Sequence, residues 1–256
     1  MAQITFLGTA ASIPSADRDN TAFLFAHRSR TILVDCPGAL THKLLKTGVN
    51  VASVTQVIVT HRHVDHIYGL IDLLHCQMRY RNTLTIYSTP VCIRLIKKLI
   101  RLFKLDGPKF GCVRFVDVLS KEYFYSAGGL KIKAFGNTHI PGSFAVGFYW
   151  NSRMLGYSSD TALCETLLKE FNTCDYLIHE CLASSHFFKK HPSLYALHTD
   201  AKTLAARLKG TPIKTVIPVH FLLTEKDEER KIMRELAPLG KKLRLVKDFQ
   251  SVDLKR

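Results

Sequence analysis

The chain has 256 residues, 46% of them hydrophobic, and its 36 lysines and arginines outnumber its 21 acidic residues, which leaves a formal net charge of +15. This apolar content can fill one large core, and no apolar run reaches the 18 residues that would span a membrane. No linker, low-complexity run or block of charge marks a boundary, so we expect residues 1–256 to form a single domain. A chain this basic attracts polyanions, which favours nucleic acid or another phosphate-rich molecule as a partner.

The N-terminus and the cysteines indicate the compartment. Residues 3–7 alternate like a strand and lack the basic and then apolar layout of a signal peptide. The seven cysteines are odd in number and include no Cys-x-x-Cys pair, which is typical of reduced thiols. We therefore expect a cytoplasmic protein with no membrane-spanning segment.

Short apolar runs with alternating polarity predict strands, and runs with helical periodicity predict helices. The expected strands cover residues 3–7, 21–26, 31–35, 57–59, 84–87, 113–119, 122–125, 130–135, 146–150, 154–158, 176–178, 214–219 and 243–246. The expected helices cover residues 40–48, 68–80, 90–105, 162–171, 201–209 and 225–236. Strands that alternate with helices in this way predict an α/β domain.

A dense group of metal-ligand side chains follows the predicted strand at 57–59. Thr60 is followed by three histidines and one aspartate within six positions: His61, His63, Asp65 and His66. Imidazole and carboxylate are the ligands that suit zinc and similar divalent ions. On an extended segment His61 and His63 point the same way, while Asp65 and His66 lie one step further on and can serve a second ion.

Further candidate ligands and acid–base residues also follow predicted strands: His139, Asp160, His179 and His220. In open α/β architectures ligands gather at strand ends, so this shared placement predicts one converged site. Asp160 can bridge two cations because a carboxylate has an oxygen for each, although a helix cap explains the same residue. Asp35 ends another buried run, where it either orients a ligand histidine or caps a turn.

The predicted helix at 90–105 carries five basic residues beside its apolar stripe and no acidic residue. An ordinary amphipathic helix with a solvated basic face explains this pattern. The same face could instead contact a phosphate backbone or attach the chain to a membrane surface. The sequence leaves these three interpretations open.

The H-x-H-x-D-H core, followed by His139, Asp160 and His220, resembles the metallo-β-lactamase superfamily over nearly the whole chain. The resemblance implies an αβ/βα four-layer sandwich with a dinuclear metal site at one edge. It implies two divalent ions, zinc first, although manganese and iron accept overlapping ligands. One ion would be held by His61, His63 and His139, the other by Asp65, His66 and His220, and Asp160 would bridge them.

Within that superfamily the chain is similar to ribonuclease Z and related phosphodiesterases. The residues that resemble the N-terminal signature of these enzymes are Gly8, Thr9, Pro14, Arg18 and Asn20. Two later elements, His179-Glu180 and His198-Thr199-Asp200, are similar as well. This similarity implies that His198 donates a proton to the leaving oxygen and that Glu180 steers it.

The chain differs from ribonuclease Z in three informative places. After His220 it continues with Phe221, Leu222 and Leu223, where those enzymes usually have a serine–arginine element. Only 20 residues separate His139 from Asp160, which leaves no room for the arm that grips tRNA. Ser159 stands where those enzymes have glycine before the bridging aspartate.

We therefore expect a hydrolase that cleaves phosphodiester bonds, acting on an RNA 3′ end or on a small or cyclic phosphodiester. Asp65 would orient the attacking water, and His198 would aid the basic leaving group together with His179 and Glu180. One alternative is a hydrolase of a carboxylic ester, lactone, thioester or β-lactam on the same metals. Another is a non-catalytic basic RNA-binding module with a structural metal, although seven candidate ligands exceed the four of a closed site. The sequence leaves a homodimer open.

Overall fold

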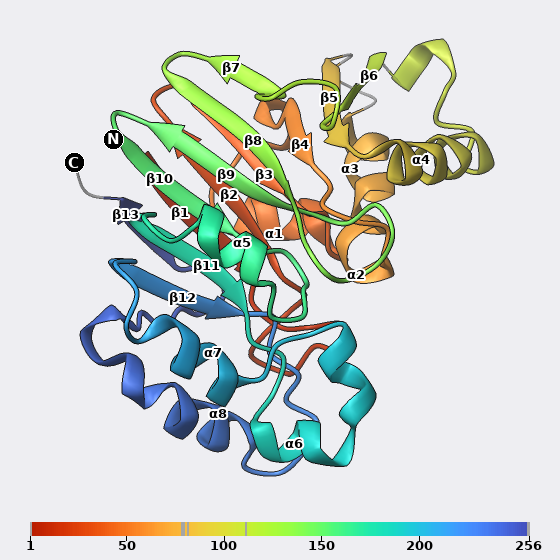
Figure 1. Cartoon of the computed structure of the whole chain (residues 1–256). Helices are drawn as coiled ribbons and strands as arrows, with labels where there is room; N and C mark the ends of the chain where they lie inside the picture. The colour runs from red at the N-terminus through yellow and green to blue at the C-terminus, as the bar shows by residue number, and fades with distance from the viewer. Residues whose placement is uncertain (1, 78–79, 81, 111, 255–256) are drawn as a thin grey trace.

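Two β-sheets packed face to face form the centre of the molecule (Figure 1). The computed structural model describes residues 2–77, 80, 82–110 and 112–254. In spatial order, the first sheet consists of β13 (Ser251–Leu254), β1 (Ala2–Gly8), β2 (Ala22–His27), β3 (Arg30–Val34), β4 (Gln56–Ile58), β5 (Thr83–Ser88) and β6 (Cys112–Asp117). The second consists of β12 (Thr215–Val219), β11 (Tyr176–Glu180), β10 (Arg153–Tyr157), β9 (Phe144–Trp150), β8 (Leu130–Gly136) and β7 (Tyr125–Ala127).

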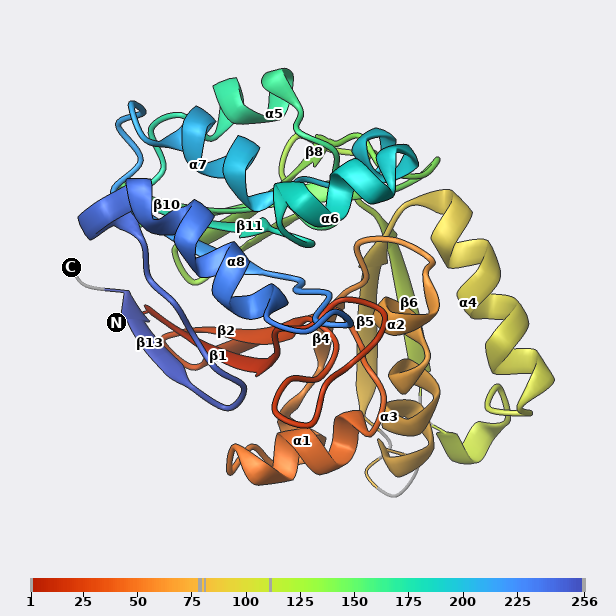
Figure 2. The same cartoon turned by 90° about the horizontal axis from the view of Figure 1, so that it is seen from below.

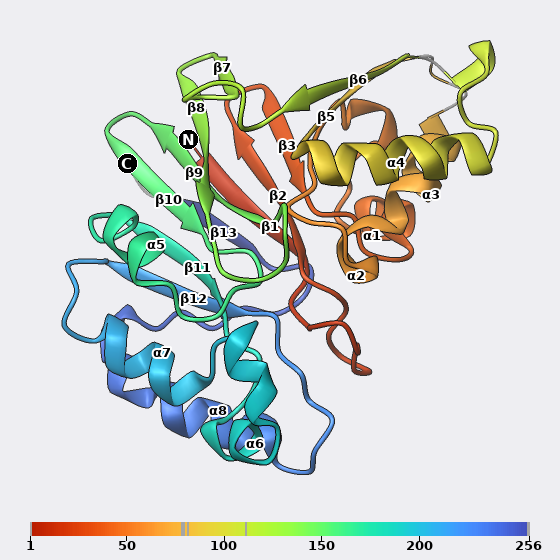
Figure 3. The ribbon, with the colours of Figure 1, turned by 45° about the vertical axis from the view of Figure 1, so that its right-hand side comes forward.

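Helices cover both outer faces, so the layers run helix, sheet, sheet, helix (Figure 2). On the first sheet lie α1 (Leu40–Lys46), α2 (Val64–Ile67), α3 (Gly69–Gln77) and α4 (Pro90–Leu102), with α4 next to α3 (Figure 3). Beyond the second sheet lie α5 (Glu165–Glu170), α6 (Ser185–Lys190), α7 (Ala201–Leu208) and α8 (Glu228–Leu236). Short 3-10 turns are η1 (Val51–Ser53), η2 (Pro108–Phe110), η3 (Pro192–Ala196) and η4 (Ala237–Lys242). The expected αβ/βα four-layer sandwich is confirmed, and within the described ranges no helix is long and apolar enough to cross a membrane.

Aromatic side chains fill the space between the two sheets. Phe25 stacks on Phe148 with ring centroids 4.6 Å apart, and Phe23 meets Tyr157 edge-on at 5.0 Å. Because successive side chains of a strand face opposite ways, the intervening residue Leu24 lies in the apolar cluster that packs beneath α1 and α3. The central strands are therefore buried on both faces, which explains why they appear in the sequence as nearly continuous apolar runs.

Two of the predicted strands are wrong in position. At 243–246 the chain forms only an isolated bridge, from Leu243 to Val216, and the last strand is β13, which pairs with β1. In β13 buried and exposed residues alternate, as expected for a strand at the edge of a sheet. In place of the strand predicted at 122–125, the chain forms β7, which begins at Tyr125. β7 pairs with β8 across a hairpin turn at Gly128 and Gly129, both of which have positive φ.

Several of the predicted helices differ in extent. The helix expected at 90–105 ends at Leu102 as α4, and the helix expected at 225–236 begins at Glu228 as α8. The helix expected at 68–80 is confirmed as α3 up to Gln77, and residues 78 and 79 lie outside the described residues. The helix expected at 162–171 begins later, at Glu165. The backbone N–H groups of Thr161 and Ala162 bond instead to Glu180 and to the carbonyl of Thr138, at 2.6 and 2.7 Å. These bonds anchor the residues that follow Asp160 to β11 and to the loop before β9.

Sharp turns follow three strands at one edge of the sandwich. Asp35 after β3, Ser159 after β10 and His220 after β12 have left-handed backbone conformations, with φ of 61°, 53° and 66°. Such a conformation costs about 1–3 kcal/mol in a residue other than glycine, and such residues cluster at functional sites. The fold therefore places backbone strain at three strand ends of this edge.

Gly156 on β10 occupies a position where the packing has no room for a side chain. A Cβ there would lie 2.8 Å from ring atoms of Phe171. We expect Gly156→Ala to lower the free energy of unfolding by about 1–3 kcal/mol, the usual cost of overpacking a core. Urea denaturation measures this, with Gly210→Ala as the control, because a Cβ at Gly210 meets no atom within 4 Å. Equal midpoints for Gly156→Ala and wild type would contradict the packing argument.

Candidate metal centre

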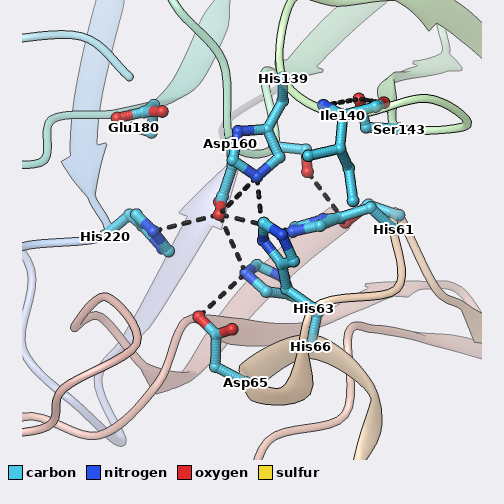
Figure 4. Close-up of polar contacts among 12 residues, drawn as sticks. His61, His63, Asp65, His66, His139, Ile140, Ser143, Asp160, Glu180 and His220 are labelled. Carbon is cyan, nitrogen blue, oxygen red and sulfur yellow. Dashed lines mark hydrogen bonds and ion pairs between the residues drawn. The ribbon is translucent and has the colours of Figure 1, made fainter. Parts of the chain in front are cut away.

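Seven side chains that the sequence predicts as metal ligands lie together at the edge where the strands end (Figure 4). Four come from the segment that follows β4 and enters α2, and the other three follow β8, β10 and β12. They are His61, His63, Asp65, His66, His139, Asp160 and His220. The strand-end placement inferred from the sequence therefore produces one converged cluster.

The seven side chains divide into two groups that share Asp160. In each group, one ligand atom from every member lies within 4.8 Å of the others. The first group is His61, His63, His139 and Asp160, and the second is Asp65, His66, Asp160 and His220. This division is the one that the resemblance to the metallo-β-lactamase superfamily implies for two ions.

Asp160 lies at the centre of the cluster, and its Oδ2 atom faces four imidazoles (Figure 4). The distances from Asp160 Oδ2 to the Nε2 atoms are 3.1 Å for His220, 3.4 Å for His66, 3.5 Å for His61 and 3.8 Å for His139. Burial alone would raise the pKa of Asp160, but His220, His66 and His61 hold it well below its usual value. The side chain is therefore an ionised carboxylate that both groups can use.

Four buried atoms of the cluster residues have no hydrogen-bond partner among the described residues: His61 Nε2, His66 Nε2, Asp160 Oδ1 and His220 Nδ1. A buried polar atom left without a partner costs about 1–3 kcal/mol. Imidazole nitrogens and carboxylate oxygens that converge on one space form the donor set of zinc and related ions. The residues at this edge therefore fit divalent cations.

The electrostatics of the cluster favour neutral imidazoles in four of its five histidines. A neutral imidazole offers the lone pair that binds a metal. Burial lowers the pKa of His61, His63, His139 and His220. His66 is the exception: burial alone would lower its pKa, but the carboxylates of Asp160 and Asp35 raise it well above its usual value.

A second layer of buried hydrogen bonds supports the cluster from behind. Asp35 accepts hydrogen bonds from the backbone N–H of Thr60 at 2.8 Å, from His66 Nδ1 at 2.9 Å and from the Tyr157 hydroxyl at 3.2 Å. An imidazole whose Nδ1 donates to a carboxylate keeps its Nε2 lone pair for a metal. Asp35 thus orients a histidine of the cluster, as one of the two interpretations of the sequence predicts.

His198 and Glu180 form a hydrogen-bonded pair beside the cluster. His198 Nδ1 lies 2.8 Å from Glu180 Oε1, and the buried Glu180 carboxylate also accepts from two backbone N–H groups at 2.6 and 3.2 Å. Burial alone would lower the pKa of His198, but Glu180 raises it above its usual value. The ring of His198 lies 4.9 Å from that of His139 and 5.7 Å from that of His220, centroid to centroid. The imidazole of this pair therefore adjoins both groups of candidate ligands.

His179, another predicted catalytic residue, faces away from the cluster. Along β11 successive side chains alternate, so His179 shares the side of Leu177 and Cys181, which pack with α7. Its Nδ1 donates to the backbone carbonyl of Glu180 at 2.7 Å. The structure does not bring the His179 side chain to the other candidates, and its catalytic role stays a prediction.

The sequence did not reveal three residues that support the cluster. Thr60 contacts Asp35, Tyr157 donates to the same carboxylate, and Asn137 Nδ2 donates to the backbone carbonyl of Asp160 at 3.0 Å. The one sequence signal that could have identified them is proximity, since each lies within three residues of a candidate ligand. Their roles depend on contacts between strands that are far apart in the sequence.

The fold and the arrangement of this site define a class of protein. The crystal structure of the metallo-β-lactamase fold protein YhfI from Bacillus subtilis is similar over 98% of each chain, with a TM-score of 0.83 and 19% sequence identity. The present chain therefore has the metallo-β-lactamase fold. The family described as "Anti-Pycsar protein Apyc1" matches residues 2–211, and the chain belongs to this family.

Curated relatives of the chain include bacterial ribonucleases Z. That of Exiguobacterium sibiricum is 24% identical over 299 aligned positions, which cover 98% of each chain. That of Bradyrhizobium diazoefficiens is 30% identical over 141 residues, which are 54% of this chain and 46% of the enzyme, so the match spans about half of that relative. The likeness to ribonuclease Z expected from the sequence is confirmed.

Asp35→Asn tests the support behind the cluster, because it replaces one carboxylate oxygen by an NH₂ group of similar size. Oδ1 accepts from the backbone N–H of Thr60, and Oδ2 accepts from His66 and Tyr157. Whichever oxygen the NH₂ group replaces, the donors on that side lose their acceptor. We expect the free energy of unfolding of the metal-free protein to fall by about 1–3 kcal/mol for each donor left without an acceptor. Urea denaturation measures the loss, and Asp253→Asn on the exposed side of β13 is the control. Equal losses in the two variants would argue against a supporting role for Asp35.

Proposed function

We propose that the chain hydrolyses phosphodiester bonds with the help of divalent metal ions. The observation that carries the proposal is the 2.8 Å hydrogen bond between His198 and Glu180 beside the histidine and aspartate cluster. Such a pair can protonate a basic leaving oxygen. Hydrolysis of an alkyl phosphodiester requires this protonation, whereas hydrolysis of a thioester does not. The ribonuclease Z relatives support the same class of reaction.

We assign the metal ligands according to the two groups in the cluster. His61, His63 and His139 would hold one ion, Asp65, His66 and His220 the other, and Asp160 would bridge them. Zinc suits these donors best, and manganese and iron accept overlapping ligands. Ions bound there would activate a water molecule and neutralise charge on the phosphoryl oxygens.

Asp65 has a further role in this proposal. Burial alone would raise its pKa, but His66 and His220 lower it, so Asp65 is ionised at neutral pH. The oxygens of an ionised carboxylate only accept hydrogen bonds. Asp65 would accept one from the attacking water and so orient the lone pair of that water toward phosphorus.

His198 would donate the proton that the leaving oxygen needs. Its Nδ1 is bonded to Glu180, so its Nε2 is left to face the substrate. The raised pKa of His198 favours the protonated form that a general acid requires at neutral pH. His179 would support this pair indirectly, because its Nδ1 bonds to the backbone carbonyl of Glu180.

We propose an RNA 3′ end or a small or cyclic phosphodiester as the substrate. Between His139 and Asp160 the chain consists of a short loop and the antiparallel pair β9–β10 of the second sheet, so this segment forms no arm. The outer face of α4 exposes basic side chains that could contact phosphates, among them Arg94, Lys98 and Arg101. Relatives named ribonuclease Z support RNA as the first substrate to test.

The proposed reaction is tested by assaying the purified protein side by side on an RNA with a 3′ extension, a cyclic nucleotide and a thioester. We expect turnover of at least one phosphodiester, loss of that turnover after chelation with EDTA, and recovery with zinc or manganese. Faster turnover of the thioester than of every phosphodiester would contradict the proposal. Failure of the metal-restored protein to hydrolyse any of them would favour the non-catalytic RNA-binding alternative.

His198→Ala tests the proton donor. We expect turnover of an alkyl phosphodiester to fall by about 10²–10⁴-fold, the usual contribution of a general acid. An activated aryl phosphodiester should lose much less, because its leaving group needs no proton. Steady-state kinetics on both substrates measure this, with elemental analysis to show that metal content is unchanged. His191→Ala, at an exposed histidine of the same segment, is the control, and full activity of His198→Ala on the alkyl ester would refute the assignment.

Glu180→Gln tests the electrostatic coupling in the pair. Glu180 raises the pKa of His198, so removal of its charge should lower that pKa. A general acid works only while it is protonated. As the pH is raised, the variant should therefore lose activity earlier, at a lower pH than wild type does. The pH profile of kcat/KM for an alkyl phosphodiester measures this shift of the basic limb. An unmoved basic limb would show that His198 is not the group that the profile reports.

A further inference from the structure

Ser159 follows β10 and precedes Asp160, and its backbone lies in the left-handed region with φ of 53°. Residues other than glycine rarely adopt this conformation, because the Cβ atom crowds the following carbonyl. The residue is 1% exposed, so water does not satisfy its hydroxyl. A serine here is favourable only if the hydroxyl makes a contact that glycine could not make.

The Ser159 hydroxyl makes such a contact across the two sheets. Ser159 Oγ lies 2.9 Å from Oγ1 of Thr60, which is fully buried. Thr60 follows β4 in the first sheet and precedes His61, whereas Ser159 follows β10 in the second sheet. The hydrogen bond therefore joins the residue before Asp160 to the residue before His61.

The directions of the hydrogen bonds around Thr60 follow from its neighbours. Thr60 Oγ1 lies 3.0 Å from both side-chain oxygens of Asp35 and 3.2 Å from His61 Nδ1. Carboxylate oxygens accept, so the hydroxyl proton of Thr60 points to Asp35. The two lone pairs of the Thr60 oxygen are then left to accept from Ser159 Oγ–H and from His61 Nδ1–H.

This arrangement selects one tautomer of His61. With its proton on Nδ1, the ring has a lone pair on Nε2, the atom that lies 3.5 Å from Asp160 Oδ2 in the cluster. Without the Ser159 hydroxyl, Thr60 loses one of the groups that fix its orientation. Its own proton could then turn toward His61 Nδ1, which would place the His61 proton on Nε2 and remove the lone pair from the cluster.

We infer that Ser159 is a positioning residue of the proposed metal centre. Its hydroxyl acts through Thr60 to hold His61 so that the Nε2 lone pair of His61 points toward a divalent ion. This inference rests on the proposed function, because the proposed function assigns His61 and Asp160 as metal ligands. Hydrogen bonds that orient a metal-ligating histidine contribute about 10–100-fold to metal affinity. Ser159 itself contacts neither the substrate nor the ion.

Two substitutions at position 159 separate the hydroxyl from the backbone strain. Ser159→Ala removes the hydroxyl and keeps the strained Cβ, whereas Ser159→Gly removes both. Competitive zinc titration of the metal-free protein against a chromophoric chelator measures affinity. We expect both variants to bind zinc about 10–100-fold more weakly than wild type. The melting temperature of the metal-free protein should be lower for Ser159→Ala than for Ser159→Gly, because only the glycine relieves the strain.

Two further measurements test the relay through Thr60. Thr60→Ser keeps the hydroxyl and should bind zinc like wild type, whereas Thr60→Val should bind it as weakly as Ser159→Ala. The ¹⁵N chemical shifts of the His61 ring in the metal-free protein report its tautomer. We expect the proton on Nδ1 in wild type and a shift toward Nε2 in both Ser159 variants.

The possible outcomes distinguish this inference from the proposed function. Wild-type zinc affinity in both Ser159 variants would overturn the inference and leave the proposed function standing. Weaker binding by Ser159→Ala alone would overturn it too, because strain and not the hydroxyl would then be responsible. Failure of the wild-type protein itself to take up zinc or manganese would overturn both.

Discussion

The hydrogen bonds that converge on Asp35 are the constraint on which the site depends. This carboxylate is fully buried at the end of β3, and its donors come from both sheets: Thr60 and His66 follow β4, and Tyr157 ends β10. A buried carboxylate is costly unless its oxygens are satisfied. The two sheets must therefore pack in one relative position, and the aromatic contacts between them, such as Phe25 on Phe148, determine that position. The geometry of the histidine cluster is coupled in this way to the packing of the core.

The cluster itself is an unfavourable arrangement that a large fold can support. Several of its buried nitrogen and oxygen atoms have no hydrogen-bond partner among the described residues, and three residues at the same edge have strained backbones. Each such feature costs roughly 1–3 kcal/mol. A bound cation would remove the first of these costs by satisfying the converging lone pairs, so metal binding and folding should stabilise one another. The ligands therefore meet at a locally unfavourable place, and the apolar clusters on both sides of each sheet compensate for it.

The elements that could be predicted are those whose signal is local. Buried strands such as β3, β4 and β11 are short apolar runs bounded by polar residues, and α4 and α7 show helical periodicity. The errors occur where distant contacts decide. Residues 243–246 have a strand-like composition, but the edge of β1 pairs with β13 instead. Helix α5 begins later than predicted, and the segment before it is anchored by the hydrogen bond from the Thr161 N–H to Glu180. His179 follows an apolar run as the ligands do, but the alternation along β11 turns its side chain away from them.

The sequence by itself determined the chemistry of the candidate site, because the types and spacing of His61, His63, Asp65 and His66 limit which ions they suit. It also indicated His139, Asp160 and His220, because each follows a strand and strand ends share an edge. The tertiary structure alone decided how these side chains are held. Ser159 and Thr60 are 99 positions apart, and their hydrogen bond exists only because two sheets pack against each other. Composition and periodicity describe neighbours along the chain, whereas the tautomer and direction of a ligand depend on neighbours in space.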